Sequence, residues 1–206
     1  MADQSNIKES RILYMMDKKI IKPYIEGVPI NFEKYRTKIV RDENDNEVLR
    51  IDYDPSPGNP QQPGGGLLNR IAQMVEGFLN FKIGDLAGNY IYSVKSLNFF
   101  HKKNDFSIMN GNETEEKFKA AHYLMNLAKE KVEVTDTGSN PVLISEYRGF
   151  RKSLEVHDSN GAQVALLHAP IVSMRDRWKL EFNGDCDRYL VLIMAAIMSE
   201  FGEKSL

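Results

Sequence analysis

The sequence predicts a mainly β protein with helices (α+β), in which an antiparallel β-barrel of roughly 10–12 strands encloses a hydrophobic C-terminal helix. The first observation is an apolar run from Tyr189 to Met198, which makes a helix apolar on every face and therefore buried. The second observation is the length of this run: at about 1.5 Å per residue, it covers only about half of a bilayer's hydrocarbon core, so a protein core is favoured over a membrane. The third observation is the series of short, turn-punctuated, strand-like segments before it. A closed sheet around the helix accounts for all three and leaves no exposed sheet edge.

Size and composition fit one cytoplasmic domain. The 206 residues, interpreted as a single domain over 1–206, can bury about 70% of the unfolded chain's surface. The net charge of −2 argues against a general nucleic-acid binder, so nucleic acid is not an expected partner. One cysteine, Cys186, excludes an internal disulfide framework. The polar N-terminus has no apolar signal core, and we expect a cytoplasmic protein that can associate peripherally with membranes.

A Pro/Gly-rich tract at 55–66 is the main break in the chain. Four prolines and four glycines in twelve residues are incompatible with a helix or a central strand. We interpret it as a loop within one domain, because residues 1–54 hold too little apolar material for a core of their own; an interdomain linker is the alternative. The apolar spacing of 67–79 then predicts an amphipathic helix.

Hairpins and one helix are predicted on either side of this tract. Segments 37–41 and 47–53 flank a polar turn, and segments 81–84 and 90–95 flank Asp85–Asn89, so each pair predicts a hairpin. A strand is expected at 106–109. Acidic residues open the stretch 113–130 and lysines close it, which predicts a helix there.

The C-terminal third reads as a meander of strands. Turns at 136–140 and 158–161 separate segments 131–135 from 142–147 and 152–157 from 162–167. Further strands are expected at 171–174 and 177–182, and the buried helix is expected to begin near Asp187.

The stretch from Lys131 to Phe201 resembles the phospholipid scramblase, LURP-one-related and tubby C-terminal superfamily. The resemblance rests on the hairpin Leu154–Leu167, the strand block 174–182 and the apolar helix 189–201. It implies a roughly twelve-stranded barrel around a hydrophobic helix. Tubby-like members bind phosphoinositide headgroups and scramblases act on lipids, so it also implies a lipid-related role. The Pro/Gly tract, two additional helical segments and the lack of a cysteine-rich palmitoylation segment depart from the pattern.

Two basic groups are the candidate ligand-binding residues. Arginine and lysine side chains match phosphate oxygens, and neighbouring strands would bring the groups together as a patch for a lipid headgroup. The residues are Arg148, Arg151, Lys152, Arg175, Arg177 and Lys179. The alternative is that 177–182 is simply a half-exposed strand, with Arg177, Lys179 and Glu181 facing outward.

The sequence supports neither a metal site nor a catalytic site, and no cofactor is expected. The segment 42–47 has oxygen ligands at calcium-loop spacing but lacks the glycine at position 6, so we interpret it as a hairpin turn. The four histidines show no paired metal spacing. Cys186 lies between two aspartates, whose field should raise its pKa and suppress a nucleophilic thiolate.

These observations predict a non-enzymatic soluble barrel that binds phospholipid headgroups, or a protein partner, at a membrane surface. The alternative is a structural subunit of a larger complex that docks through the 55–79 segment.

Overall fold

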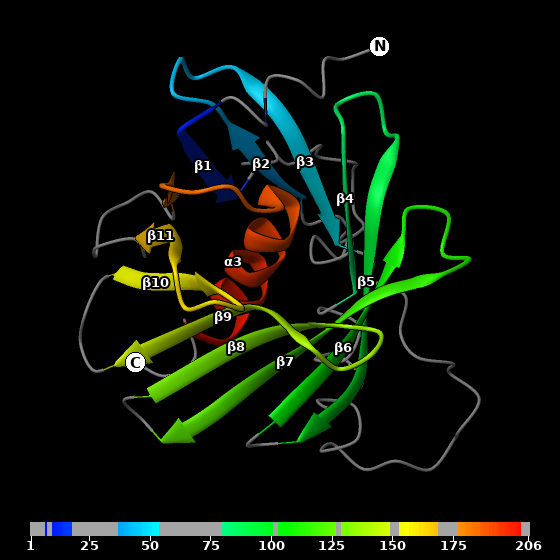
Figure 1. Cartoon of the computed structure of the whole chain (residues 1–206). Helices are drawn as coiled ribbons and strands as arrows, with labels where there is room; N and C mark the ends of the chain where they lie inside the picture. The colour runs from blue at the N-terminus through cyan, green and yellow to red at the C-terminus, as the bar shows by residue number, and fades with distance from the viewer. Residues whose placement is uncertain are drawn as a thin grey trace, which may run out of the picture.

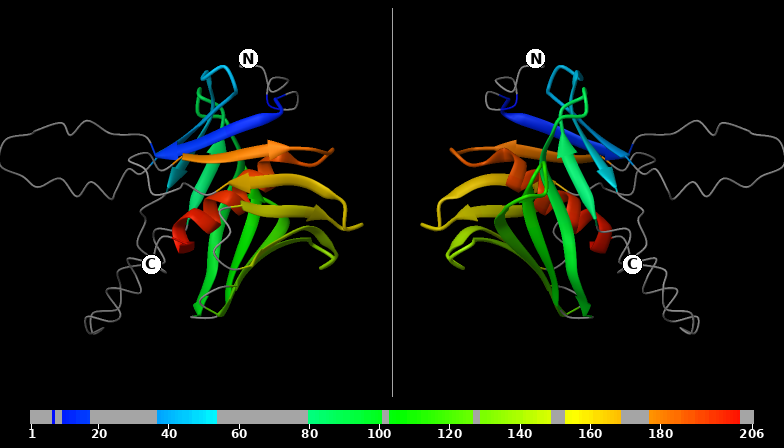
Figure 2. Two further views of the ribbon diagram at one scale, coloured as in Figure 1. Left: turned by 90° about the vertical axis from the view of Figure 1, so that its left-hand side faces the viewer. Right: turned by 90° about the vertical axis from the view of Figure 1, so that its right-hand side faces the viewer.

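A computed structural model describes residues 7, 10–17, 37–53, 80–100, 103–126, 129–148, 153–168 and 177–202. Within these residues, twelve antiparallel strands form a closed barrel around one helix, α3 (Arg188–Gly202), as Figure 1 shows. The predicted barrel around a C-terminal helix is therefore confirmed. Each strand pairs with its neighbours in the chain, and closure pairs β12 with β1, which lie side by side in Figure 2.

The strands are β1 (Ile12–Asp17), β2 (Thr37–Arg41), β3 (Glu47–Tyr53), β4 (Phe81–Gly84), β5 (Tyr90–Phe100), β6 (Lys103–Asn110), β7 (Glu116–Asn126), β8 (Lys129–Asp136), β9 (Pro141–Arg148), β10 (Ser153–Asp158), β11 (Gln163–His168) and β12 (Arg177–Phe182). The predicted hairpins β2–β3, β4–β5, β8–β9 and β10–β11 are confirmed by their antiparallel registers.

The core forms because α3 is apolar on every side. From Leu190 to Met198 no residue is more than 2% exposed. The strands supply the opposing surface by alternation: on β12, Trp178, Leu180 and Phe182 face inward while the residues between them face outward. The helix begins at Arg188, as expected, and Asp187 caps it by accepting the backbone N–H of Tyr189 at 2.9 Å.

Five hairpin turns at the end of the barrel where α3 begins share one hydrogen-bond pattern. In each, the side-chain oxygen of an Asp or Asn accepts the backbone N–H four residues later, at 2.8–2.9 Å. The residue three positions after it has a positive φ, which is the left-handed position of a bulged hairpin turn. The leading residues are Asp42, Asp85, Asn110, Asp136 and Asp158, and the left-handed residues are Asp45, Gly88, Glu113, Ser139 and Gly161.

The predicted helix over 113–130 is wrong, because this stretch forms β7 and the beginning of β8. Ala120 and His122 point inward while Lys117 and Lys119 point outward, which is a strand period of two. The acidic start and basic end resemble helix-end charges, and the buried polar His122 interrupts the apolar alternation that marks a strand.

Three other predicted elements lie outside the described residues: the 55–66 loop, the 67–79 helix and the 171–174 strand. The alternative function that depends on 55–79 therefore stays a prediction. Residues before the tract do join the barrel, since β1, β2 and β3 complete its closure.

Truncating a side chain of the enclosed helix should destabilise the protein far more than truncating a side chain on the surface. We expect Ile193→Ala to lower the free energy of unfolding by about 2–5 kcal/mol, because the Ile193 side chain is fully buried and its removal leaves a cavity in the core. Leu86→Ala, at a site that is 43% exposed, should cost less than about 1 kcal/mol. Urea denaturation measures both, and equal losses would contradict an enclosed helix.

Candidate functional site

The structure describes the side chains of two of the six basic residues that the sequence predicted as ligand-binding. Arg177 and Lys179 project from the outer face of β12. Arg148 is the last residue of β9, and its side chain is not described; Arg151, Lys152 and Arg175 lie outside the described residues. Strands β10 and β11 separate β9 from β12, so these strands are about 14 Å apart rather than adjacent.

Arg177 reaches across β1 toward the β2–β3 turn. Its guanidinium lies 3.7 Å from the centroid of the Tyr14 ring, and its Nη2 lies 3.7 Å from Asp45 Oδ1. The ring supports the flat face of the guanidinium, so the planar fork is held in one orientation.

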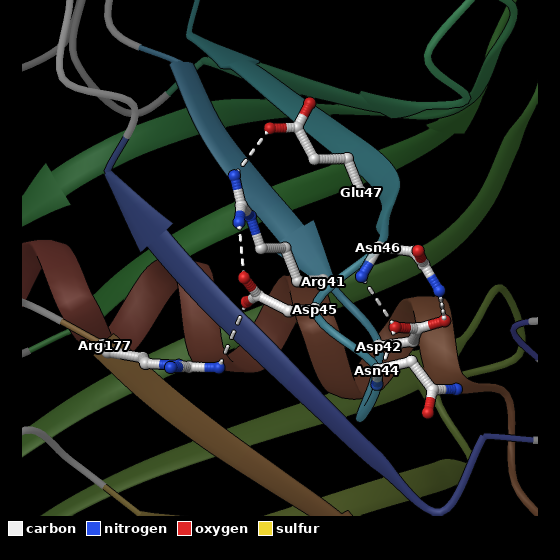
Figure 3. Close-up of polar contacts among 7 residues, drawn as sticks. All are labelled: Arg41, Asp42, Asn44, Asp45, Asn46, Glu47 and Arg177. Carbon is white, nitrogen blue, oxygen red and sulfur yellow. Dashed lines mark hydrogen bonds and ion pairs between the residues drawn. The ribbon is translucent and has the colours of Figure 1, made fainter.

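Arg41 approaches the same carboxylate from the other side. Its Nη1 donates to Asp45 Oδ2 and its Nη2 to Glu47 Oε1, each at 2.9 Å. The hydrogen bond to Glu47 is the largest effect that raises the pKa of Arg41. Figure 3 shows the Asp45 carboxylate between the two guanidinium groups, an arrangement we call the arginine clamp (Arg41, Asp45, Arg177).

Lys179 is held by a neighbour on its own strand. Its ammonium pairs with Glu181, which also lies 3.5 Å from His168 Nε2 on β11. This pairing raises the pKa of Lys179 and lowers that of Glu181. Of the predicted residues described in full, Arg177 alone therefore joins a cluster that draws cations from different strands.

A second cluster of the same kind lies on β4 and β5, and we call it the lysine clamp (Lys82, Lys95, Glu113). Lys82 Nζ lies 2.6 Å from Glu113 Oε1, and Lys95 pairs with Oε2. Ser93 Oγ donates to Glu113 Oε1 at 3.1 Å. These contacts, led by those of Lys82 and then Lys95, lower the pKa of Glu113 to about 2. Glu113 is thus ionised at every ordinary pH.

The sequence reasoning missed Arg41 and the whole lysine clamp. One sequence feature could have pointed to both clamps. Two turns place a carboxylate, Asp45 or Glu113, three residues after the leading Asp or Asn, whereas two other turns place glycine at that position. The partners of these carboxylates lie on other strands, so the sequence pattern alone does not reveal them.

Other chemistry finds no support in the described part of the chain. There, no three acidic, histidine or cysteine side chains group as metal ligands. Asp42 Oδ1 accepts hydrogen bonds from the backbone N–H groups of Asn44 and Asn46, each at 2.9 Å. The predicted hairpin turn at 42–47 is therefore confirmed. Burial, more than the neighbouring aspartates, raises the pKa of Cys186 to about 11, so its thiol stays protonated.

The comparisons with known proteins bear on the fold alone. No family model and no curated protein matches this sequence. An X-ray structure of a protein from Arabidopsis thaliana is similar, with a TM-score of 0.55 over 98% of each chain and 10% identity. Separately, the described part of the chain holds no helix of the length and apolarity that crossing a bilayer demands.

The depressed pKa of Glu113 predicts an acid-dependent loss of stability. Its stabilising contribution is complete above the unfolded pKa near 4.5 and disappears as the pH falls toward 2. We expect the wild type to lose more stability than Glu113→Gln between pH 5 and pH 3, measured by urea denaturation. Glu115→Gln, which alters an exposed carboxylate of the same turn, should follow the wild type; identical acid losses in all three proteins would refute the assignment.

Proposed function

We propose that this protein is a non-enzymatic barrel that binds the phosphate of an anionic phospholipid headgroup at a membrane surface, through the arginine clamp. The carrying observation is the exposed Asp45 carboxylate between guanidinium groups from two different parts of the barrel. A phosphate has the charge and the oxygen spacing to take the place of that carboxylate.

Displacing Asp45 costs little. Its side chain is 64% exposed, and exposed ion pairs contribute only about 0–1 kcal/mol because water and salt screen them. The Nε atoms of Arg41 and Arg177 are also buried and make no hydrogen bond to the residues that the structure describes. An incoming anion would instead meet the Nη groups that face Asp45, and phosphate offers these more acceptor oxygens than a carboxylate does.

A membrane source of the phosphate is favoured by two considerations. A basic side chain near an anionic bilayer gains about 1 kcal/mol, which adds to the direct contacts. The resemblance of residues 131–201 to tubby-like and scramblase proteins also implies a lipid ligand.

Neutralising both arginines should weaken membrane binding. We expect Arg41→Gln/Arg177→Gln to reduce partition onto phosphatidylserine-containing vesicles about 30-fold, from roughly 1 kcal/mol per charge. Flotation of the folded proteins measures this. Lys117→Gln/Lys119→Gln is the matched control, because these lysines also pair with carboxylates but lie on β7. Flotation equal to this control, or no flotation of the wild type, would refute the proposal.

Removing the internal carboxylate should have the opposite effect. Asp45→Asn keeps the left-handed backbone conformation, which asparagine tolerates, and removes the negative charge that lies between the two guanidinium groups. We expect about fivefold tighter vesicle binding in the flotation assay. Glu43→Gln makes the same change in net charge in the same turn, and there the gain should be smaller. Equal gains would show that overall charge, not the clamp, controls binding.

A further inference from the structure

The two clamps are built on the same turn position. Among the five turns that share the Asp or Asn hydrogen bond, two place glycine at the left-handed position, at Gly88 and Gly161. Asp45 and Glu113 occupy the equivalent position with φ values of 66° and 58°. A side chain is strained there, and glutamate lacks the short polar side chain that eases it for aspartate or asparagine. The turns therefore hold carboxylates where glycine would be less strained.

In both turns the strained residue meets two cations. Asp45 lies between Arg41 of β2 and Arg177 of β12, and Glu113 lies between Lys82 of β4 and Lys95 of β5. Hairpin formation requires neither set of contacts, because the other three turns close through the same backbone pattern without them.

Both clamps face outward on one continuous wall of the barrel, made of β12, β1, β2, β3, β4 and β5. One strand, β3, separates β2 from β4, and the register sets Lys82 level with Thr37, four residues from Arg41. The backbones that carry the two cations are therefore roughly 10 Å apart across the sheet and about 13 Å apart along it. Arg50 and Tyr90 occupy the surface between them, and Tyr90 donates a hydrogen bond to Asp52 at 2.9 Å. Lys82 Nζ lies 5.4 Å from the centroid of the Tyr90 ring, so this surface continues into the lysine clamp.

We propose that the lysine clamp is a second anion-binding site, and that this wall lies on an anionic lipid surface with Asp45 and Glu113 as built-in competitors that lipid phosphates displace. The inference rests on the proposed function for the arginine clamp and adds the orientation and valency of binding. Two sites on one rigid wall engage separate headgroups, so the second binding event is intramolecular.

The two competitors differ in how firmly they are held. The Glu113 side chain is 26% exposed and has three partners, Lys82, Lys95 and Ser93. The Asp45 side chain is 64% exposed and, within the part of the chain that the structure describes, pairs with the two arginines alone. The arginine clamp therefore opens first, and the lysine clamp contributes when anionic lipid is abundant.

The test compares vesicle flotation at low and high fractions of phosphatidylserine in phosphatidylcholine. Lys82→Gln/Lys95→Gln should match the wild type at the low fraction and bind about 30-fold more weakly at the high fraction. Lys117→Gln/Lys119→Gln again controls for the loss of two charges. Glu113→Gln should bind more tightly than the wild type at both fractions, a gain that a folding defect cannot imitate.

The outcomes separate this inference from the proposed function. If Lys82→Gln/Lys95→Gln behaves like the β7 control at both lipid fractions while Arg41→Gln/Arg177→Gln still loses binding, the second site is refuted and the arginine clamp stands. If the arginine variant also behaves like the control, both proposals fail. Inorganic phosphate serves as a competitor: inhibition at concentrations matching the lipid phosphate would show that free phosphate is the ligand and would overturn the membrane surface.

Discussion

Enclosure of an all-apolar helix is the constraint on which the rest of this structure depends. Because the segment of α3 from Leu190 to Met198 offers no polar face, the sheet has to surround it, and twelve strands close completely rather than leaving an edge. Closure commits the inward side chain at every second strand position to packing. Interaction surfaces are consequently left to the outward side chains and to the turns, which is where both clamps lie.

Closure also determines which distant residues meet. The pairing of β1 with β12 brings residues 12–16 alongside residues 177–181, and Arg188 reinforces the join by donating to the carbonyl groups of Ile7 and Ser10. Arg177 can reach the β2–β3 turn only because β1 is inserted between β12 and β2. At the other end of α3, Lys38 of β2 lies 3.6 Å from Glu200 in a buried ion pair. Such a pair adds little net stability, but breaking it is costly, so it disfavours other positions of the helix end.

The sequence predicted those features that depend on neighbouring residues. The apolar run, the Asp-led turns and the alternation of 177–182 each follow from local patterns, and each appears in the structure. Prediction failed where a local pattern was ambiguous: the charges that flank 113–130 suit a helix as well as two strands, and His122 conceals the alternation. The clamps were beyond reach for another reason, since Arg41 and Arg177 become neighbours only through the register of the closed barrel.

Each clamp is occupied by a carboxylate of the protein itself, and this determines which ligands can displace that carboxylate. An unfilled pair of cations on an exposed wall would attract any anion, whereas a tethered carboxylate admits only a ligand that binds better than the carboxylate does. For the lysine clamp, protons are a poor trigger, because the pKa of Glu113 near 2 keeps its carboxylate charged well below neutral pH. Opening then requires a competing anion, and a surface of many phosphates supplies one at high local concentration. A wall with two such filled clamps would therefore discriminate by the density of anionic groups rather than by acidity.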